Sequence, residues 1–195
     1  MGNPTLAPDE RFTYRHYRTW PDEERWELIE GHAWAMSPTP IRPHQKLSMR
    51  LSGWINSFLE GKPCEVYAAP FDVLFPESDE PDDEIGTVVQ PDILVICDKS
   101  KLTRSGARGA PDWVIEILSP RTAKKDFEVK HRLYERHGVR EYWIVDPGAA
   151  VIHAWRLGKN EKYGEETIYE DGEAAPSSVL NGLVIDTKKL FADLD

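Results

Sequence analysis

Two carboxylates, Asp92 and Glu116, stand in strongly apolar parts of the chain and could bind a hard divalent cation through oxygen. Glu116 interrupts the run 113–118, which has the composition of a central strand covered on both faces. A buried carboxylate without a partner is costly, so Glu116 requires a cationic side chain, a metal ion or a cavity. A purely structural buried ion pair is the alternative interpretation.

Asp92 opens a second apolar run, at 92–96, directly after Pro91. By itself this signal is also typical of a turn at the start of a strand. The two acids together indicate a metal site more strongly than either does alone, because carboxylates on adjacent strands of one sheet can converge on a divalent cation. Such a cation keeps coordination positions for water and phosphate.

The apolar pattern predicts a single domain over residues 1–195, with its core at about 42–157. Apolar residues recur at three- and four-residue steps from 42 to 60, ahead of Gly61, which indicates an amphipathic helix. A turn signal between apolar flanks predicts an N-terminal hairpin at about 26–36. Three strands of one sheet, a helix ending at Gly138 and two further strands are expected at 64–75, 88–97, 112–118, 122–137, 140–145 and 151–157, the last extended by 162–169.

Composition restricts the class of protein. No stretch approaches the roughly 18 uninterrupted apolar residues of a membrane span, and the N-terminus lacks the basic start and apolar stretch of a secretory signal. We therefore expect a soluble, cytoplasmic protein with no membrane partner. Its two cysteines, Cys64 and Cys97, lack zinc-site spacing and are expected to be reduced, half-buried thiols.

Charge is segregated along the chain. The formal net charge of -10 opposes nonspecific binding to polyanions unless a local basic face overrides it. Acidic residues concentrate in the loop-like segment 77–84. From Lys99 to Arg132, by contrast, nine Lys and Arg outnumber four Asp and Glu, so the basic face is expected there.

Pro91-Asp92, followed by Glu116 on the next predicted strand, resembles the motif that names the PD-(D/E)XK nucleases. The wider pattern is similar to the Uma-type restriction endonucleases, and it is carried by segments 27–31, 71–73, 109–120 and 138–147 with His44, Asp126, Lys130 and Tyr134. The resemblance spans roughly residues 27 to 157. It implies an α/β (α+β) fold, with a restriction-endonuclease-like αβββαβ core, a mixed central sheet, an N-terminal hairpin and extra C-terminal strands.

The chain departs from the motif at one position, because Leu118 stands where the family's lysine should follow the glutamate. The resemblance implies that Lys130, on the following helix, takes its place. Glu116 lies ~10 Å before its strand ends and Lys130 lies ~12 Å into the returning helix, so the depths match. Lys130 would position or activate water, and Asp126 would orient it. Without the resemblance, Asp126 and Lys130 are typical of an exposed (i, i+4) pair.

The resemblance implies hydrolysis of phosphodiester bonds in DNA, with RNA as the alternative partner. Mg²⁺, or Mn²⁺ in its place, would be held by Asp92, Glu116 and the carbonyl of Ile117, and would polarise the phosphate. Basic side chains around the site are the expected phosphate contacts, namely Arg121, Lys124, Lys125 and Arg132.

Three further residues are supporting candidates, each with a structural alternative. Glu27 is either a third acid near the metal or a hairpin charge. Asp72 either faces the same cleft or lies on a solvated strand face. His44, near a helix start, is either a base or a local hydrogen-bonding residue. The aromatic residues Tyr134, Tyr142, Trp143 and Trp155 are most simply core.

Two other functions remain open. A catalytically silent nucleic-acid-binding or assembly module would explain Leu118 and the net charge of -10. A metal-dependent hydrolase of a small phosphorylated substrate is the weaker alternative. The apolar segment 179–185 could cover a neighbouring molecule, which predicts a homodimer.

Overall fold

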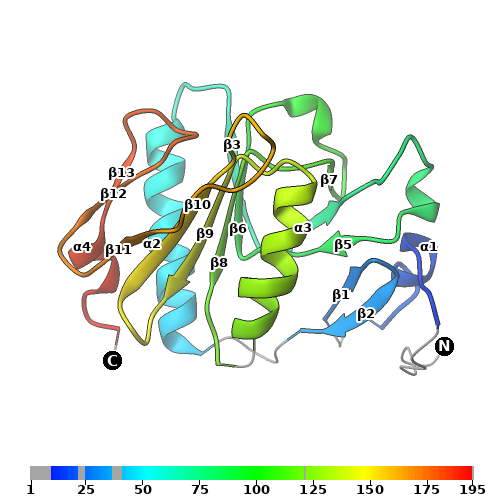
Figure 1. The fold of residues 1–195 in the computed structure, drawn as a ribbon, viewed down its shortest axis with the longest axis horizontal. Coiled ribbons are helices and arrows are strands. Elements are labelled where there is room, and N and C mark those ends of the chain that lie inside the picture. The colour runs from blue at the N-terminus through cyan, green and yellow to red at the C-terminus, as the bar shows by residue number, and fades with distance from the viewer. Residues whose placement is uncertain (1–9, 22–24, 37–40, 121, 195) are drawn as a thin grey trace.

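A computed structural model describes residues 10–21, 25–36, 41–120 and 122–194, and its centre is a six-stranded sheet (Figure 1). The strand order is β11-β10-β9-β8-β6-β3. The parallel pairing of β8 with β9 within otherwise antiparallel neighbours makes the sheet mixed, as predicted. The strands are β3 (Glu65–Ala68), β6 (Ile93–Ile96), β8 (Trp113–Ile117), β9 (Glu141–Asp146), β10 (Val151–Arg156) and β11 (Thr167–Tyr169).

Two helices cover opposite faces of this sheet. The long helix α2 (Arg42–Leu59) packs on the face that carries Ile115 and Ile117. The other face, which carries Leu94 and Val114, packs against α3 (His131–Arg136) and the π-helical stretch Lys125–Lys130 that leads into it. Because side chains alternate along a strand, Glu116 shares the α3 face with Val114, and Asp92 is in step with Leu94.

A second, five-stranded sheet has the order β2-β1-β5-β4-β7. Its strands are β1 (Trp26–Ile29), β2 (His32–Ala35), β4 (Asp72–Leu74), β5 (Val88–Val89) and β7 (Gly106–Arg108). The hairpin β1–β2 confirms the predicted one. The short helix α1 (Tyr14–Tyr17) and two 3₁₀ helices, Asp82–Glu84 and Lys99–Lys101, complete this part of the chain. Phe12, Leu28 and Ile85 belong to a separate small core beneath α1.

The predictions of single strands at 64–75 and 88–97 were wrong, because each run divides between the two sheets. The first gives β3 and β4, with Pro70 between them, and the second gives β5 and β6, with Pro91 between them. Proline has no backbone N–H to donate to a ladder, so each run loses its pairing at that point. The two breaks lie together, since the Ala69 amide donates to the Asp92 carbonyl at 3.0 Å.

The C-terminal segment lies against α2 rather than facing outward. It forms the pair β12 (Ala174–Pro176) and β13 (Val184–Asp186) and then α4 (Thr187–Phe191). Leu180, Leu183 and Ile185 are buried in the same core as α2. These apolar side chains are therefore buried within the chain and do not form the exposed surface that suggested a homodimer. The homodimer itself stays a prediction.

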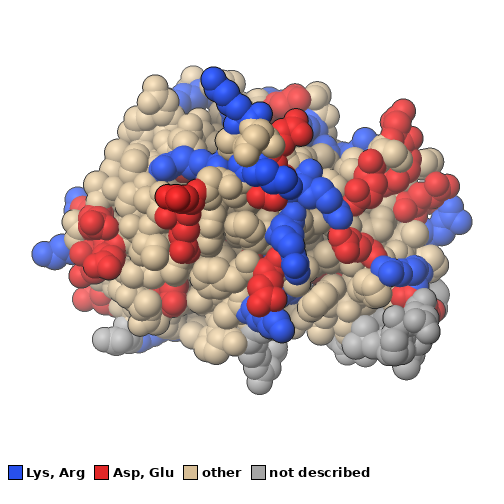
Figure 2. Space-filling model, in the orientation of Figure 1, with Lys and Arg blue, Asp and Glu red and all other residues tan. Residues whose placement is uncertain are grey.

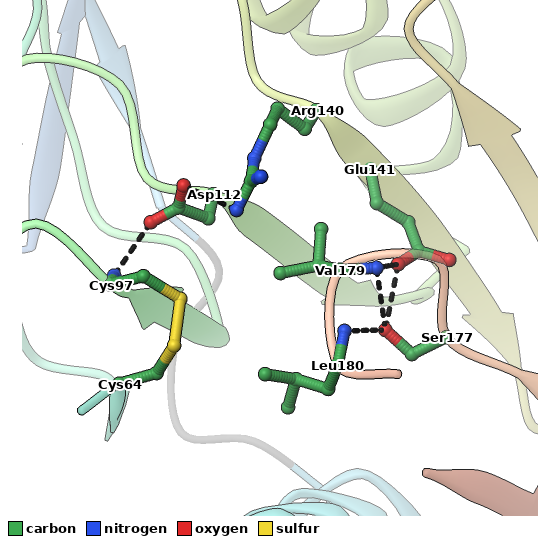
Figure 3. Close-up of a disulfide and its surroundings, with 8 residues drawn as sticks. All are labelled: Cys64, Cys97, Asp112, Arg140, Glu141, Ser177, Val179 and Leu180. Carbon is green, nitrogen blue, oxygen red and sulfur yellow. Dashed lines mark hydrogen bonds and ion pairs between the residues drawn. A yellow bond between two sulfur atoms is a disulfide. The ribbon is translucent and has the colours of Figure 1, made fainter. Parts of the chain in front are cut away.

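The prediction of reduced thiols was wrong, because Cys64 and Cys97 form a disulfide (Figure 3). Antiparallel pairing of Glu65 with Ile96 places the two cysteines opposite each other at the next position along β3 and β6. The spacing rules that exclude a zinc site say nothing about cross-strand register, which is why the sequence did not indicate the bond. In the same view, Asp112 accepts a hydrogen bond from the Cys97 amide at 2.6 Å and pairs with Arg140 at 2.7 Å.

Within the described ranges, no helix combines the length and apolar character that crossing a bilayer requires.

Candidate active site

The two predicted metal-binding carboxylates, Asp92 and Glu116, lie beside each other on neighbouring strands of the six-stranded sheet. Ile93 pairs with Ile115 in the antiparallel register of β6 and β8, so Asp92 lies opposite Glu116 one step further. Asp92 is tied to this position by its Oδ2 atom, which accepts from the Ile117 amide at 2.7 Å. His44 Nε2, from α2, lies 3.1 Å from the same oxygen. Asp92 is thus held beside Glu116 by one contact from strand β8 and one from helix α2.

Glu116 is almost entirely buried, at 4% exposure, and its Oε1 atom has two donors. Lys130 Nζ lies 2.8 Å away and the Tyr134 hydroxyl lies 2.7 Å away. Burial raises the pKa of Glu116 to about 8, although Lys130 acts against it, and Asp92 and Asp126 raise the pKa further. Glu116 is therefore a carboxylate whose negative charge is only partly compensated.

Glu27 joins this group from the other sheet. It is fully buried on β1, where Lys130 Nζ lies 2.8 Å from Oε1 and Lys125 Nζ lies 2.7 Å from Oε2. Burial alone would raise the pKa of Glu27, but Lys130 and Lys125 lower it to about 2. Glu27 is thus an interior acid between two ammonium groups, and the interpretation as a solvated hairpin charge is wrong.

Lys130 bridges the two sheets, since its ammonium contacts both Glu27 and Glu116 at 2.8 Å. It is 3% exposed, which rules out the exposed (i, i+4) pair with Asp126. Burial alone would lower its pKa, but Glu116 and Glu27 raise the pKa of Lys130 well above its ordinary value. A lysine held protonated in this way is suited to orienting groups and stabilising negative charge, and not to accepting a proton.

Asp126 is also buried, and burial raises its pKa in spite of the nearby Lys130 charge. Among the described residues, the hydrogen bonds and ion pairs of the Lys130 ammonium go to Glu27 and Glu116 rather than to Asp126. The reason is the π-helical stretch Lys125–Lys130, whose wider turn changes which side chains face each other. Within the described residues, the proposed orientation of Lys130 by Asp126 is therefore not supported by a hydrogen bond or ion pair between the two side chains.

The site has the composition to hold a divalent cation. Four buried or half-buried carboxylates, Glu27, Asp92, Glu116 and Asp126, accompany two lysines, Lys125 and Lys130, which leaves an excess of two negative charges when all are ionised and His44 is neutral. Within the described part of the chain, Asp92 Oδ1 and Glu116 Oε2 have no hydrogen-bond partner.

Hard cations prefer such oxygen ligands, and the carbonyl of Ile117 remains the expected third one. No cluster of three or more His, Cys, Asp or Glu side chains within the described ranges already has metal-binding geometry, so a cation would rest on two carboxylates and other oxygens.

Asp72 lies in a neighbouring polar network. Its Oδ1 atom accepts from the Tyr17 hydroxyl at 2.9 Å and from Gln90 Nε2 at 2.8 Å. Gln90 also donates its backbone N–H to Glu27 Oε1 at 3.1 Å, which links the network to the buried acids. Asp72 is therefore adjacent to the site without contacting Lys130.

Tyr134 and Gln90 are site residues that the sequence did not reveal as such. Tyr134 was interpreted as core, yet its hydroxyl reaches Glu116. Its position one turn after Lys130 was the available signal, because residues four apart share a helix face. Gln90 had no comparable signal, since a polar residue before a proline is typical of a loop.

The predicted phosphate contacts differ in their placement. Lys124 and Arg132 are exposed, whereas Lys125 turns inward to Glu27 and is 10% exposed. Arg121 lies outside the described residues. Figure 2 shows Lys and Arg side chains across the middle of the face that carries α3, with acidic side chains both among them and toward the two ends.

The fold and the paired acids define a class, the restriction-endonuclease-like proteins with a mixed sheet between two helices. A solved structure with 23% sequence identity, described as that of "a putative nuclease belonging to DUF820" from Anabaena variabilis, has the same fold, with a TM-score of 0.74 over 94% of this chain and 99% of that one. The mixed α+β fold class is therefore confirmed.

The family model for Uma2, described as "Putative restriction endonuclease", matches residues 14–188, and the chain belongs to this family. A curated relative, the "Uncharacterized protein slr1290" of Synechocystis sp., is 25% identical over 150 residues, which are 76% of this chain and 72% of the relative.

Proposed function

We propose that this protein is an endonuclease that hydrolyses phosphodiester bonds in DNA with the aid of Mg²⁺. The observation that carries the proposal is the pair of half-buried Asp92 and buried Glu116, which lie opposite each other on neighbouring strands with one oxygen of each free of protein partners in the described structure. Membership of the Uma2 family supports nuclease chemistry at this pair.

Each residue has a distinct part in the proposed reaction. Asp92, Glu116 and the Ile117 carbonyl hold the cation. When bound, Mg²⁺ or Mn²⁺ polarises the phosphate and makes water more acidic. Lys130, held protonated by its two acids, orients the attacking water and stabilises the charge that develops on the phosphate. Lys124 and Arg132, which are exposed near the site, contact the phosphates on either side.

The decisive experiment is cleavage of a mixed panel of single- and double-stranded DNA and RNA with Mg²⁺, with Mn²⁺ and with EDTA. Cleavage of DNA that requires the metal and is lost in Glu116→Gln supports the proposal. Glu165→Gln, which changes an exposed acid away from the site, is the matched control. A wild-type protein that binds Mg²⁺ yet leaves every strand intact would sink the proposal.

A catalytically silent module is the second candidate, and one specific observation favours it. The ion pairs among Glu27, Lys130 and Glu116 satisfy much of the buried charge without a metal. In that case the protein would bind nucleic acid with the same affinity in EDTA and in Mg²⁺, and would cleave none of the panel. Release of phosphate from a small phosphorylated compound, with no strand cleaved, would identify the weaker alternative, a small-substrate hydrolase.

A further inference from the structure

A cavity of about 670 Å³ lies beside the buried acids, between α1, β1 and the start of β4. Its size falls within the roughly 300–1,000 Å³ that is typical of small-molecule sites. Among the expected site residues that the structure describes, Asp72 alone borders it. The cavity is therefore a second feature of the molecule, and its lining indicates what it could bind.

Three aromatic side chains line the cavity, namely Tyr17, Trp20 and Trp26. The Tyr17 and Trp20 ring centroids are 5.4 Å apart, and the Trp20 and Trp26 centroids are 6.0 Å apart at an interplanar angle of 69°. All three are only half-buried, although they adjoin a small apolar core. Partly exposed aromatic faces next to a cavity are suited to stacking on a planar ring.

The cavity also has a fixed polar edge. Asp72 Oδ1 accepts from both the Tyr17 hydroxyl and Gln90 Nε2, and Gln90 Oε1 accepts from Arg25 Nη2 at 2.7 Å. Asp72 Oδ2 has no partner among the described residues, so one acceptor remains available at this edge. A planar ring whose rim carries hydrogen-bond donors and acceptors matches this combination of aromatic face and polar edge, and a nucleobase is such a ring.

The position and charge of the cavity connect it to the buried acids. Gln90 lines the cavity and donates its backbone N–H to Glu27, whose Oε1 atom also contacts Lys130. Arg25 lines the same cavity and supplies positive charge for a phosphate backbone, whereas Arg18, also in the lining, is paired with Asp83. A base in the cavity would thus belong to a strand whose backbone lies over the surface next to the buried acids.

We propose that this cavity binds one unpaired base of the nucleic-acid substrate, stacked on the face of Trp20 with Trp26 against its edge, and read by Asp72, which Gln90 and Tyr17 hold in place. The inference rests on the proposed nuclease function and deepens it, because it names the substrate class as a strand with a base out of its duplex stack.

The test compares two fluorescently labelled single strands of equal length, one with bases and one with a base-free sugar-phosphate backbone. Binding is measured by fluorescence anisotropy at low ionic strength in EDTA, so that no strand is cleaved. We expect the strand with bases to bind roughly 5- to 150-fold more tightly, the range that stacking on an aromatic side chain gives. Equal affinity for both strands, or binding of neither, would overturn the proposal.

Two pairs of variants locate the effect. Trp20→Ala should weaken binding of the strand with bases and leave the base-free strand unchanged, whereas Tyr14→Ala, at the start of α1 and outside the cavity lining, should change neither. If Trp20→Ala does not fold, Tyr17→Phe keeps the ring and removes the bond to Asp72, and it should alter the preference among the four bases where Tyr14→Phe does not. Unchanged base preference in Tyr17→Phe would remove the polar edge from the proposal.

Two further measurements separate this inference from a free-nucleotide site and from the proposed nuclease function. A mononucleotide that binds as tightly as the strand would overturn the assignment to a nucleic acid and indicate a free nucleotide. Wild-type protein that cleaves DNA but binds both strands equally would refute the base cavity alone. Wild-type protein that prefers bases but cleaves nothing with Mg²⁺ or Mn²⁺ would instead refute the proposed function.

Discussion

At the scale of the single residue, Lys130 has two roles. Its ammonium pairs with both Glu27 and Glu116, and in the proposed reaction it also orients the attacking water. Removing one partner of a buried ion pair leaves an uncompensated charge, which typically costs about 3–5 kcal/mol. Structural and chemical effects of a substitution at Lys130 must therefore be measured separately.

In Lys130→Ala, we expect the cleavage rate to fall by about 10²- to 10⁴-fold, the usual loss for one proton-transfer or positioning group. Mg²⁺ affinity, measured by calorimetry, should be largely retained, because the proposed ligands Asp92 and Glu116 remain. The free energy of unfolding should also fall, and circular dichroism must show that the variant is folded at the assay temperature. Lys124→Ala, an exposed lysine on the same segment, is the control. A wild-type cleavage rate in folded Lys130→Ala would remove Lys130 from the mechanism.

Glu116 and Glu27 predict opposite pH dependences of stability. The folded state raises the pKa of Glu116 from 4.5 to about 8, so the stability that its protonated form contributes is complete below about pH 4.5 and is lost as the pH rises through 8. Glu116→Gln cannot ionise at this position. Its free energy of unfolding, minus that of the wild type, should therefore increase between pH 5 and pH 8 in EDTA. Denaturant unfolding at several pH values measures this difference, and a difference that shrinks with pH would contradict it.

Glu27→Gln should behave in the opposite way, because the pKa of Glu27 is lowered to about 2. Ionised Glu27 contributes stability above about pH 4.5, and this contribution is lost as the pH falls toward 2. The variant should therefore be less stable than the wild type at pH 7 and nearly equal to it in strong acid, as measured by the same unfolding experiment. Equal stability of the two proteins at pH 7 would argue against the ion pairs of Glu27 with Lys125 and Lys130.

The sequence revealed Asp92, Glu116 and Lys130 because an acid inside an apolar run conflicts with its surroundings, and because the family pattern relates the three. It did not reveal the burial of Glu27, since a charge in a hairpin is usually solvated. That burial depends on the second sheet meeting the first, which is a tertiary contact and leaves no local pattern. The same holds for Gln90, whose role comes from contacts with Glu27 and Asp72.

At the scale of the element, regular patterns were predictable and irregular ones were not. The helix α2, the hairpin β1–β2 and the strands β8, β9 and β10 follow the expected periodicity closely. The stretch 122–137 was predicted as one helix, yet it holds a π-helical part at Lys125–Lys130 before α3. A π-helical turn differs from an α-helical one by a single residue, and apolar spacing does not distinguish the two over so short a length.

Glu141 at the start of β9 fixes the C-terminal segment in place, as Figure 3 shows. Its buried carboxylate accepts hydrogen bonds from Ser177 Oγ at 2.8 Å, from the Ser178 and Val179 amides at 2.9 and 3.1 Å, and from Trp143 Nε1 at 2.9 Å. A single acid thus orders a turn 36 residues away in the sequence.

We therefore expect Glu141→Ala to lower the free energy of unfolding by on the order of 3 kcal/mol, because several buried donors lose a charged acceptor. Backbone amides of residues 177–180 should exchange hydrogen faster in the variant, which mass spectrometry can localise. Glu165→Ala, which changes an exposed acid outside the core, should change neither quantity. Unchanged exchange at 177–180 in Glu141→Ala would show that apolar packing alone holds the segment.

At the scale of the whole molecule, the Cys64–Cys97 disulfide closes a loop of sequence separation 33 that contains β4, β5 and the acidic segment 77–84. A covalent loop of this length restricts the unfolded chain and is worth roughly 3–4 kcal/mol in the chain-entropy model. The double variant Cys64→Ser/Cys97→Ser should lose about that much in urea unfolding. Wild-type protein with reductant should match the variant, and titration of two free thiols in the native, unreduced protein would contradict the bond.

The proposed reaction site and the aromatic wall of the cavity come from different parts of the chain, which bears on how related proteins diverge. Asp92, Glu116 and Lys130 belong to the six-stranded sheet and its helix, whereas the aromatic wall of the cavity comes from residues 17–26, ahead of that sheet in the chain. Under the two proposals, the aromatic contact with the base and the bond-breaking residues are thus encoded in separate stretches of the gene. Exchange of the codons for residues 17–26 between relatives would change the aromatic wall while keeping Asp92, Glu116 and Lys130, so selection can alter the contact with the base without changing the proposed reaction site.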